Sequence, residues 1–221
     1  MPSPNNPLTG RFVDLGLPSG ILWATCNLGA DSPEEAGLYY QWGDTEGHAA
    51  GSGYDFSQAN YNAKGLNLIE ANLTAEHDAA SVLLGSPVRM PKISEFMELS
   101  QNTDSEWVSN YNDSGVAGRL FTSKVNGKSV FFPAAGLFYE KSLNYRGSIC
   151  AFWSASYFSD SNAYCIYGSS SEFNPKPRAR LFGFSVRAVV GTSIPTRGLP
   201  PIDIDRDYLE FGSESYIHDE R

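Results

Sequence analysis

Runs of alternating apolar and polar residues predict strands from the start of the chain. Residues 11–15 and 21–25 are mainly apolar and flank a Gly-Leu-Pro-Ser-Gly sequence at 16–20. Because turns select glycine, proline and serine, this segment predicts a strand, a turn and a second strand.

The clearest local pattern lies between residues 120 and 132. The runs 120–125 and 128–132 surround Asn126-Gly127, and an Asn-Gly pair is strongly preferred in tight two-residue hairpin turns because both positions need a positive φ. We therefore predict a β-hairpin here, followed by a strand that begins at 137–139.

Ser32, Pro33 and Glu35 have the chemistry of a helix start. They supply an N-cap, a proline at the first helical position and the acidic partner of a capping box. They predict a helix that ends near Gly43.

Two further helices are predicted between residues 78 and 99. Residues 78–84 form a short helix, and residues 93–99 place apolar side chains three positions apart on one helical face. The preceding region, 44–76, is rich in Gly, Ala and Asn and has little periodicity, so we predict a long loop.

The stretch 147–190 mixes two kinds of position. Trp153, Phe184 and Val186 alternate with small residues as in half-buried strands, and we assign them to the core. Between them stand large residues in no amphipathic pattern: Ile149, Cys150, Phe152, Tyr157, Phe158, Tyr164, Tyr167, Arg178, Leu181 and Phe182. Alternating strands cannot point all of these inward.

Two interpretations of these large residues remain open. They fill the core and loop contacts of a β-rich domain, or they form an exposed recognition surface, since aromatic and arginine side chains give much contact area at low entropic cost. We favour display for the aromatic residues, because large exposed apolar patches usually mark interaction sites. Arg178 and Arg180 either anchor a carboxylate of a partner or are solvated.

Composition divides the chain into three parts. Residues 1–10 form a leader rich in proline and asparagine, and residues 11–191 form one domain. Residues 192–221 combine a Pro- and Gly-rich linker with an acidic tail. Apolar side chains in this tail predict that it docks on the domain or on another subunit.

The charge balance excludes some partners. A net charge of -9 argues against nucleic acid or an anionic membrane, since both demand clustered lysine and arginine. We expect no membrane insertion, because no apolar run is long enough to span a bilayer. The first residues lack the basic and apolar regions of a signal peptide.

The three cysteines have no metal-ligand spacing. Either all the thiols are free, or Cys150 and Cys165 form a disulfide and leave Cys26 free. The three histidines lie far apart in sequence, and no nucleophile elbow or phosphate loop is present. We predict no catalytic residue, no metal site and no cofactor.

Residues 11–190 resemble a known family through a series of ordered motifs. These are FVDLGLPSG at 12–20, LWATCNLGA at 22–30, SPEE at 32–35, YQWGD at 40–44, RMP at 89–91, EF at 95–96, FPAAG at 132–136, WSAS at 153–156 and FSVR at 184–187. Together they resemble the "major paralogous domain" family of gut Bacteroidetes and their phages, which has a C-type lectin-like fold. The matching region covers about four-fifths of the chain.

The resemblance implies an α+β domain of the C-type lectin-like fold. In this fold two helices lie beside a twisted antiparallel sheet, loops are long and the chain ends are close together. The last strands and loops form a ligand-binding face. In one branch, diversity-generating retroelements rewrite that face by changing adenines in a template copy, so that asparagine codons come to encode other residues.

Eleven residues fit such a variable protein, because each type is reachable from an asparagine codon through adenine changes alone. The candidate ligand-binding residues are Ile149, Cys150, Phe152, Tyr157, Phe158, Tyr164, Cys165, Tyr167, Arg178, Leu181 and Phe182. Glu172 and Lys176 are not reachable in this way, so they should belong to the constant framework.

The chain departs from its relatives of this fold in three places. Lectins that bind sugar through calcium use Glu-Pro-Asn or Gln-Pro-Asp with Trp-Asn-Asp, whereas this chain has EFNP at 172–175 and WSA at 153–155; calcium-dependent sugar binding is therefore not predicted. Lys92 replaces a helix-capping threonine. Formylglycine-generating enzymes of the same fold need a copper-binding thiol pair, and Cys150 and Cys165 are not at the expected positions.

These observations lead to a non-catalytic receptor-binding or adhesion protein. Its location would be a virion, for example a phage tail fibre, or a cell surface, and its partner a host-surface protein or glycan. The alternative is a structural subunit of a fibre or surface assembly that is held through residues 192–221 and has a fixed partner. A homo-oligomer is compatible with both.

Overall fold

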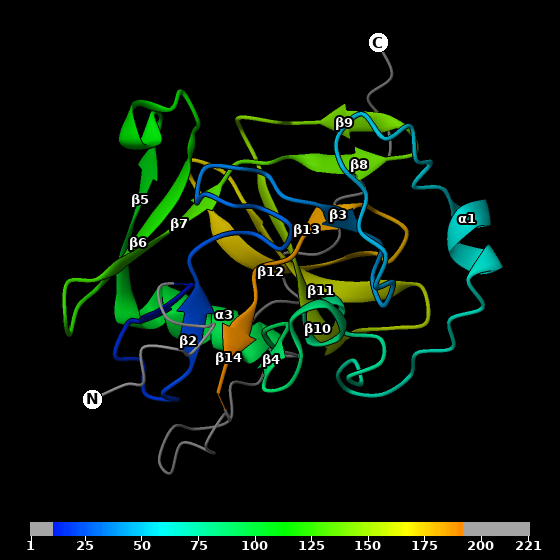
Figure 1. The fold of residues 1–221 in the computed structure, drawn as a ribbon, viewed down its shortest axis with the longest axis horizontal. Coiled ribbons are helices and arrows are strands. Elements are labelled where there is room, and N and C mark those ends of the chain that lie inside the picture. The colour runs from blue at the N-terminus through cyan, green and yellow to red at the C-terminus, as the bar shows by residue number, and fades with distance from the viewer. Residues whose placement is uncertain (1–10, 192–221) are drawn as a thin grey trace.

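The computed structural model describes residues 11–191, so the leader predicted at 1–10 and the tail predicted at 192–221 lie outside the described part. The described chain is a mixed α+β structure, mostly strands in small, largely antiparallel sheets, with three α-helices. Figure 1 shows a sheet of β5, β6 and β7 on one side of the molecule and α1 on the opposite side.

A five-stranded sheet in the order β12-β11-β10-β13-β3 lies at the centre. Its strands are β3 (Tyr39–Tyr40), β10 (Cys150–Tyr157), β11 (Asn162–Gly168), β12 (Phe173–Ala179) and β13 (Phe184–Ser185). β10, β11 and β12 pair antiparallel in chain order, while β13 runs parallel to β10. Hydrophobic clusters cover both faces of β10, since Phe152 belongs to one cluster and its neighbour Trp153 to the other.

A four-stranded sheet joins the two ends of the described chain. Its order is β1 (Phe12–Asp14), β2 (Leu22–Ala24), β14 (Val189–Val190) and β4 (Val88–Arg89). Leu22 pairs with Asp14 on one side and with Val190 on the other, so the first and last strands flank the same partner. The strand, turn and strand predicted for residues 11–25 are confirmed.

The predicted hairpin is confirmed as β6 (Gly118–Ser123) and β7 (Ser129–Pro133), to which β5 (Thr103–Val108) adds a third strand. The connection is longer than the two residues expected, because the Ser123 hydroxyl accepts the N–H groups of Val125 and Asn126. Gly127 then takes a φ of +71°, in the left-handed region that suits glycine. A separate hairpin follows, made of β8 (Leu137–Tyr139) and β9 (Ser142–Asn144).

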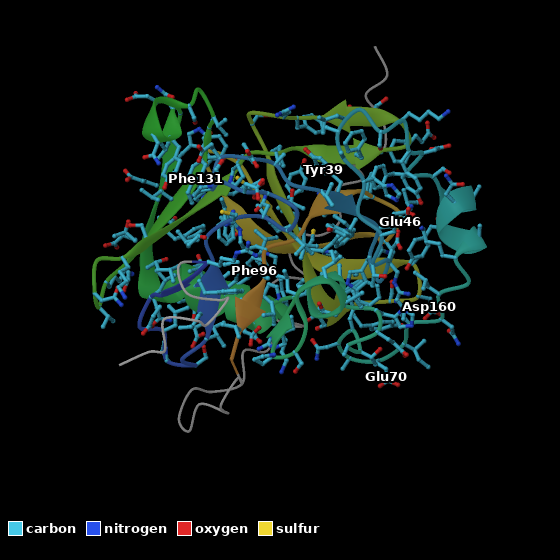
Figure 2. All side chains as sticks on the ribbon, in the orientation of Figure 1. Tyr39, Glu46, Glu70, Phe96, Phe131 and Asp160 are labelled. Atoms are coloured by element: carbon cyan, nitrogen blue, oxygen red, sulfur yellow. The ribbon has the colours of Figure 1, made fainter. Side chains whose placement is uncertain are left out.

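The two helices predicted between residues 78 and 99 are confirmed as α2 (Ala79–Leu84) and α3 (Ile93–Asn102). Glu95 compensates for the missing threonine cap of α3, since its carboxylate accepts the Lys92 backbone N–H at 2.8 Å. Phe96 anchors α3 in the core: it is fully buried, and its ring centre lies 5.1 Å from that of Trp23. Figure 2 labels this side chain near the middle of the view.

The helix predicted from Ser32 to Gly43 is wrong. The Glu35 carboxylate does accept the Asp31 N–H at 2.9 Å, but only a turn forms. Gly37 adopts a φ of +70°, and Tyr39 and Tyr40 are then used as β3. Tertiary pairing outweighs the local capping preference here, because both tyrosines become buried.

The predicted loop 44–76 contains one helix that its composition did not indicate. This helix is α1 (Gln58–Ala63), and Ser57 caps it by accepting the Asn60 N–H. Tyr61 is its buried residue, and its hydroxyl donates to the Trp42 carbonyl at 3.0 Å. A single buried aromatic residue therefore holds a helix of less than two turns against the domain.

Candidate functional site

The structure does not place the eleven candidate residues on one surface. Cys150, Phe152 and Cys165 are each 0% exposed, so the expectation that they are displayed is wrong. The physical reason is that the central sheet is covered on both faces: Phe152 pairs with Ile166 toward one hydrophobic cluster, and Cys165 faces the other.

The other eight candidates are only partly covered. Phe158 is the most open of them, with 37% of its surface exposed. The half-buried ones are Ile149, Tyr157, Tyr164, Tyr167, Arg178, Leu181 and Phe182. Part of each side chain packs against the domain and part is exposed to solvent. This arrangement fixes the side chain and leaves it able to contact a partner.

Phe158 and Tyr164 form a pair apart from the rest. Their ring centres are 5.1 Å apart in an edge-to-face contact. Tyr164 packs against the cluster that contains Phe96 of α3, whereas Ile149, Tyr157, Tyr167 and Phe182 pack against the other cluster. The sheet therefore separates these two aromatic residues from the others.

The best-defined group on the second face is centred on Tyr167. The guanidinium carbon of Arg178 lies 4.9 Å from the ring centre of Tyr167, and the Lys176 ammonium lies 5.5 Å from it. Ile149 is two residues before Ala151, the β10 partner of Tyr167, and therefore emerges on the same face. We call Tyr145, Ile149, Tyr167, Lys176 and Arg178 the cationic–aromatic surface.

Tyr145 is a member that the sequence did not single out. It is 61% exposed, it adopts a φ of +58°, and its carbonyl accepts the Ile149 N–H at 3.0 Å. Its place on the surface comes from this hydrogen bond, because Ile149 leads into the part of β10 that pairs with Tyr167. Burial raises the pKa of Tyr167, and the Arg178 charge lowers it. The sequence offered one indication of its role: Tyr145 is a large residue in the turn just before the stretch 147–190.

Lys176 and Glu172, predicted as constant framework positions, form an ion pair with each other. The Lys176 ammonium lies 2.9 Å from Glu172 Oε1, and Asn174 donates to the other carboxylate oxygen at 3.2 Å. The Lys176 hydrogen bond is the main cause of the lowered pKa of Glu172. Because its carboxylate is engaged in this way, the donor set at 172–175 does not fit a lectin calcium ion.

Arg180 is neither an anchor for a partner nor solvated, so both expectations for it are wrong. It is buried and donates to the carbonyls of Leu68 at 2.9 Å and Ser159 at 2.6 Å. Its guanidinium also lies 4.5 Å from the ring centre of Trp42. Arg180 thus ties loops to the central sheet.

Two more aromatic residues border the same face at a distance from Tyr167. The Tyr157 hydroxyl donates to Asp160 at 2.9 Å, and Figure 2 shows Asp160 at the margin of the molecule. Phe182 contacts Tyr139 of β8, with ring centres 5.4 Å apart. The partly exposed aromatic residues are therefore distributed along the rim of the sheet.

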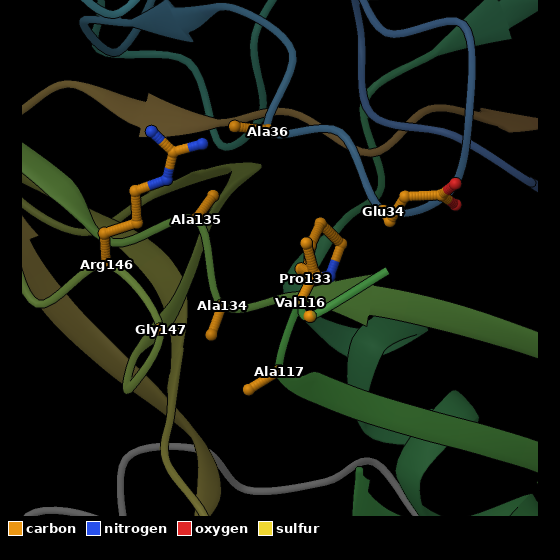
Figure 3. A pocket seen from close by; sticks show the side chains of 10 residues that line it. Glu34, Ala36, Val116, Ala117, Pro133, Ala134, Ala135, Arg146 and Gly147 are labelled. Atoms are coloured by element: carbon orange, nitrogen blue, oxygen red, sulfur yellow. The ribbon is translucent and has the colours of Figure 1, made fainter. Parts of the chain in front are cut away.

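A small pocket of about 160 Å³ lies beside β7. Its wall is mainly small and apolar, formed by residues such as Val116, Ala117, Pro133 and Ala134. Figure 3 shows Arg146 on one side and Glu34 on the other, with the Glu34 carboxylate turned away from Arg146. None of the eleven candidates lines it.

The cysteines are free thiols, so the disulfide alternative is wrong. Burial raises the pKa values of Cys150 and Cys165 to about 12 each. The two residues belong to hydrophobic clusters on opposite faces of the sheet, so they cannot form a thiol pair that binds copper. Within residues 11–191, no three His, Cys, Asp or Glu side chains gather as a metal site.

Comparison of the chain with family models, with curated proteins and with solved structures found no match. In the part of the chain that the structure describes, no helix has both the length and the apolar character needed to cross a membrane.

Proposed function

We propose that the protein is a non-catalytic binding protein of the C-type lectin-like fold that recognises a partner through the rim of its central sheet. The observation that supports it most is the stack of Arg178 on Tyr167, together with the exposed Tyr145 in the turn that leads into Ile149. Aromatic and arginine side chains that are held on paired strands provide contact area with little loss of entropy on binding.

The ordered motifs between residues 12 and 187 support a display role on a virion or a cell surface. In this proposal the face is diversified by a retroelement, and the partner is a protein or glycan of a host surface. In this proposal, variation changes partner binding only at exposed or partly exposed positions. Buried Cys150, Phe152 and Cys165 would be costly to vary, because truncation of a large core side chain, overpacking of a small one and burial of an unpaired polar group all lose stability.

Sequencing the DNA that flanks the gene tests this proposal. We expect a reverse transcriptase gene and a near-copy of the segment that encodes residues 147–190. The copy should differ by adenines at the codons of partly exposed candidates such as Tyr157, Tyr167 and Arg178. It should encode the same residue at the three buried candidates, as it should at Glu172 and Lys176.

The absence of both the copy and the transcriptase would contradict diversification. The protein would then be a surface or fibre subunit with a fixed partner. A copy that differs mainly at Cys150, Phe152 and Cys165 would also contradict the proposal, because those changes would alter the core and leave the rim unchanged.

A further inference from the structure

We propose that the cationic–aromatic surface binds an acidic peptide segment of its partner, and that Arg178 receives a carboxylate of that segment. This inference rests on the proposed binding function and adds the chemistry of the ligand. Three features of the molecule support it: the free hydrogen-bond donors of Arg178, the residues around Arg178 and the net charge of the chain.

Arg178 is held in place, but most of its hydrogen-bond donors have no acceptor within the described residues. Its guanidinium is stacked 4.9 Å from the centre of the Tyr167 ring, and one of its nitrogens donates to the Pro177 carbonyl at 3.2 Å. No carboxylate of residues 11–191 forms an ion pair with it. A guanidinium has five donors in a planar fork that matches a carboxylate, so most of this fork is available to a partner.

The neighbouring cation does not compete for the same role. Lys176 is already paired with Glu172 at 2.9 Å, which leaves Arg178 as the accessible positive charge beside Tyr167. The chain as a whole has a net charge of -9. An acidic segment is therefore repelled by the molecule in general, and a local cation determines where it can bind.

The apolar neighbours favour a peptide over an acidic sugar. Tyr145 is 61% exposed, and half-buried Ile149 lies on the same face as Tyr167. Aliphatic or aromatic side chains next to a carboxylate can cover these groups, whereas sugar hydroxyls against Ile149 would lose hydrogen bonds to water. An acidic residue flanked by apolar residues is the chemistry that fits.

The test uses the full chain and two synthetic peptides followed by NMR titration. The acidic probe is acetyl-Asp-Phe-Glu-Leu-Asp-amide, and its neutral twin is acetyl-Asn-Phe-Gln-Leu-Asn-amide. We expect the acidic probe to bind at least tenfold more tightly than the twin, with shifts at Tyr145, Ile149 and Tyr167. Its affinity should fall as salt is added, because screening weakens an exposed ion pair.

Two substitutions locate the contact. Arg178→Gln should weaken the acidic probe at least fivefold and leave the neutral twin unchanged. Lys124→Gln is the matched control, since Lys124 is a half-exposed cation in the β6–β7 loop, and it should leave both affinities unchanged. Arg178→Lys should restore only part of the affinity, because an ammonium cannot form the planar fork.

Three results would overturn the inference. The two peptides could bind with equal affinity, or Arg178→Gln and Lys124→Gln could weaken binding of the acidic probe equally. The third is that neither peptide binds detectably at millimolar concentration. If free glucuronate bound as tightly as the acidic probe at the same residues, the proposed ligand would be wrong, and a sugar acid would be the ligand. These failures are distinct from failure of the proposed function, since a diversified template copy would still establish a variable binding face.

Discussion

Arg178 and Arg180 are two residues apart, yet Arg178 stacks on the half-buried Tyr167 while Arg180 is 3% exposed and stacks on the buried Trp42. Both guanidinium groups lie within 5 Å of an aromatic ring centre. The difference is in their hydrogen bonds, since Arg180 satisfies backbone carbonyls of two separate loops.

Removing Arg180 should therefore be much more damaging than removing Arg178. Arg180→Ala leaves the Leu68 carbonyl without its side-chain donor, leaves the Ser159 carbonyl with only the Asn162 N–H, and opens space beside Trp42. We expect a loss of about 3 kcal/mol in the free energy of unfolding. Arg178→Ala, the matched control, should cost about 0.5 kcal/mol, because Arg178 is partly exposed. Urea denaturation of both variants checks this, and equal costs would contradict the assignment of Arg180 to the interior.

The division of the eleven candidates into core and rim predicts a second contrast. Phe152→Ser removes a fully buried ring that lies 4.9 Å from the centre of the Phe132 ring. It should cost about 4 kcal/mol, as large core truncations do, with an added polar group in the cavity. Phe158→Ser should cost about 1 kcal/mol, since much of that ring is exposed. Thermal unfolding measures both, and a comparable drop in melting temperature would argue against this division.

Glu95 is predicted to hold the start of α3. Its carboxylate accepts the Lys92 N–H and both terminal nitrogens of Arg89, the latter at 2.6 and 2.7 Å. Glu95→Ala removes the carboxylate from a partly buried guanidinium and the side-chain acceptor from the N-cap N–H, so we expect a loss of about 3 kcal/mol. Ser94→Ala, at the exposed neighbouring position, should change stability by less than about 0.5 kcal/mol. Chemical denaturation of the two variants distinguishes the cap from a general effect of helix sequence.

Buried thiols predict a loss of stability at alkaline pH. Burial raises the pKa values of Cys150 and Cys165 from 9.0 to about 12, so the folded state favours the neutral thiol. Their contribution is complete below pH 9 and is lost as the pH rises toward 12, at about 1.4 kcal/mol per pH unit for each thiol.

The double variant Cys150→Ala and Cys165→Ala should show a shallower decline of unfolding free energy above pH 9. Buried Tyr39 and Tyr40 also have raised pKa values and also lower the free energy of unfolding at alkaline pH. The quantity to compare is therefore the difference in slope between the wild type and the double variant. Cys26→Ala, which removes the partly buried thiol, is the control for cysteine substitution as such. Identical slopes for wild type and the double variant would contradict the burial of both thiols.

Local patterns predicted those parts of the fold that local interactions determine. Asn126-Gly127 marked the hairpin, and the spacing of Ile93 and Phe96 marked α3. The helix expected after Ser32 failed because Tyr39 pairs with Ser185, nearly 150 residues away, and no local pattern contains that partner. Burial in the central sheet determines the conformation of this segment.

The candidate site was predicted in part for a similar reason. Alternation along β10 and β11 indicated that some side chains point outward, but it did not show that a second layer covers both faces. Cys150 and Phe152 became core for that reason, whereas Tyr167 kept an accessible edge. Tyr145 was missed because its contribution depends on a turn that hydrogen-bonds its carbonyl to Ile149.

The position of β14 between β2 and β4 has a consequence for synthesis on the ribosome. The four-stranded sheet cannot close until Val189 and Val190 have left the exit tunnel, because these residues bridge Leu22 and Val88. During translation of more than 150 residues, Leu22 and Trp23 lack the neighbour that completes their pairing. The newly made chain therefore acquires its final sheet only at the end of the domain, and a ribosome stalled earlier would hold an intermediate with an open strand edge.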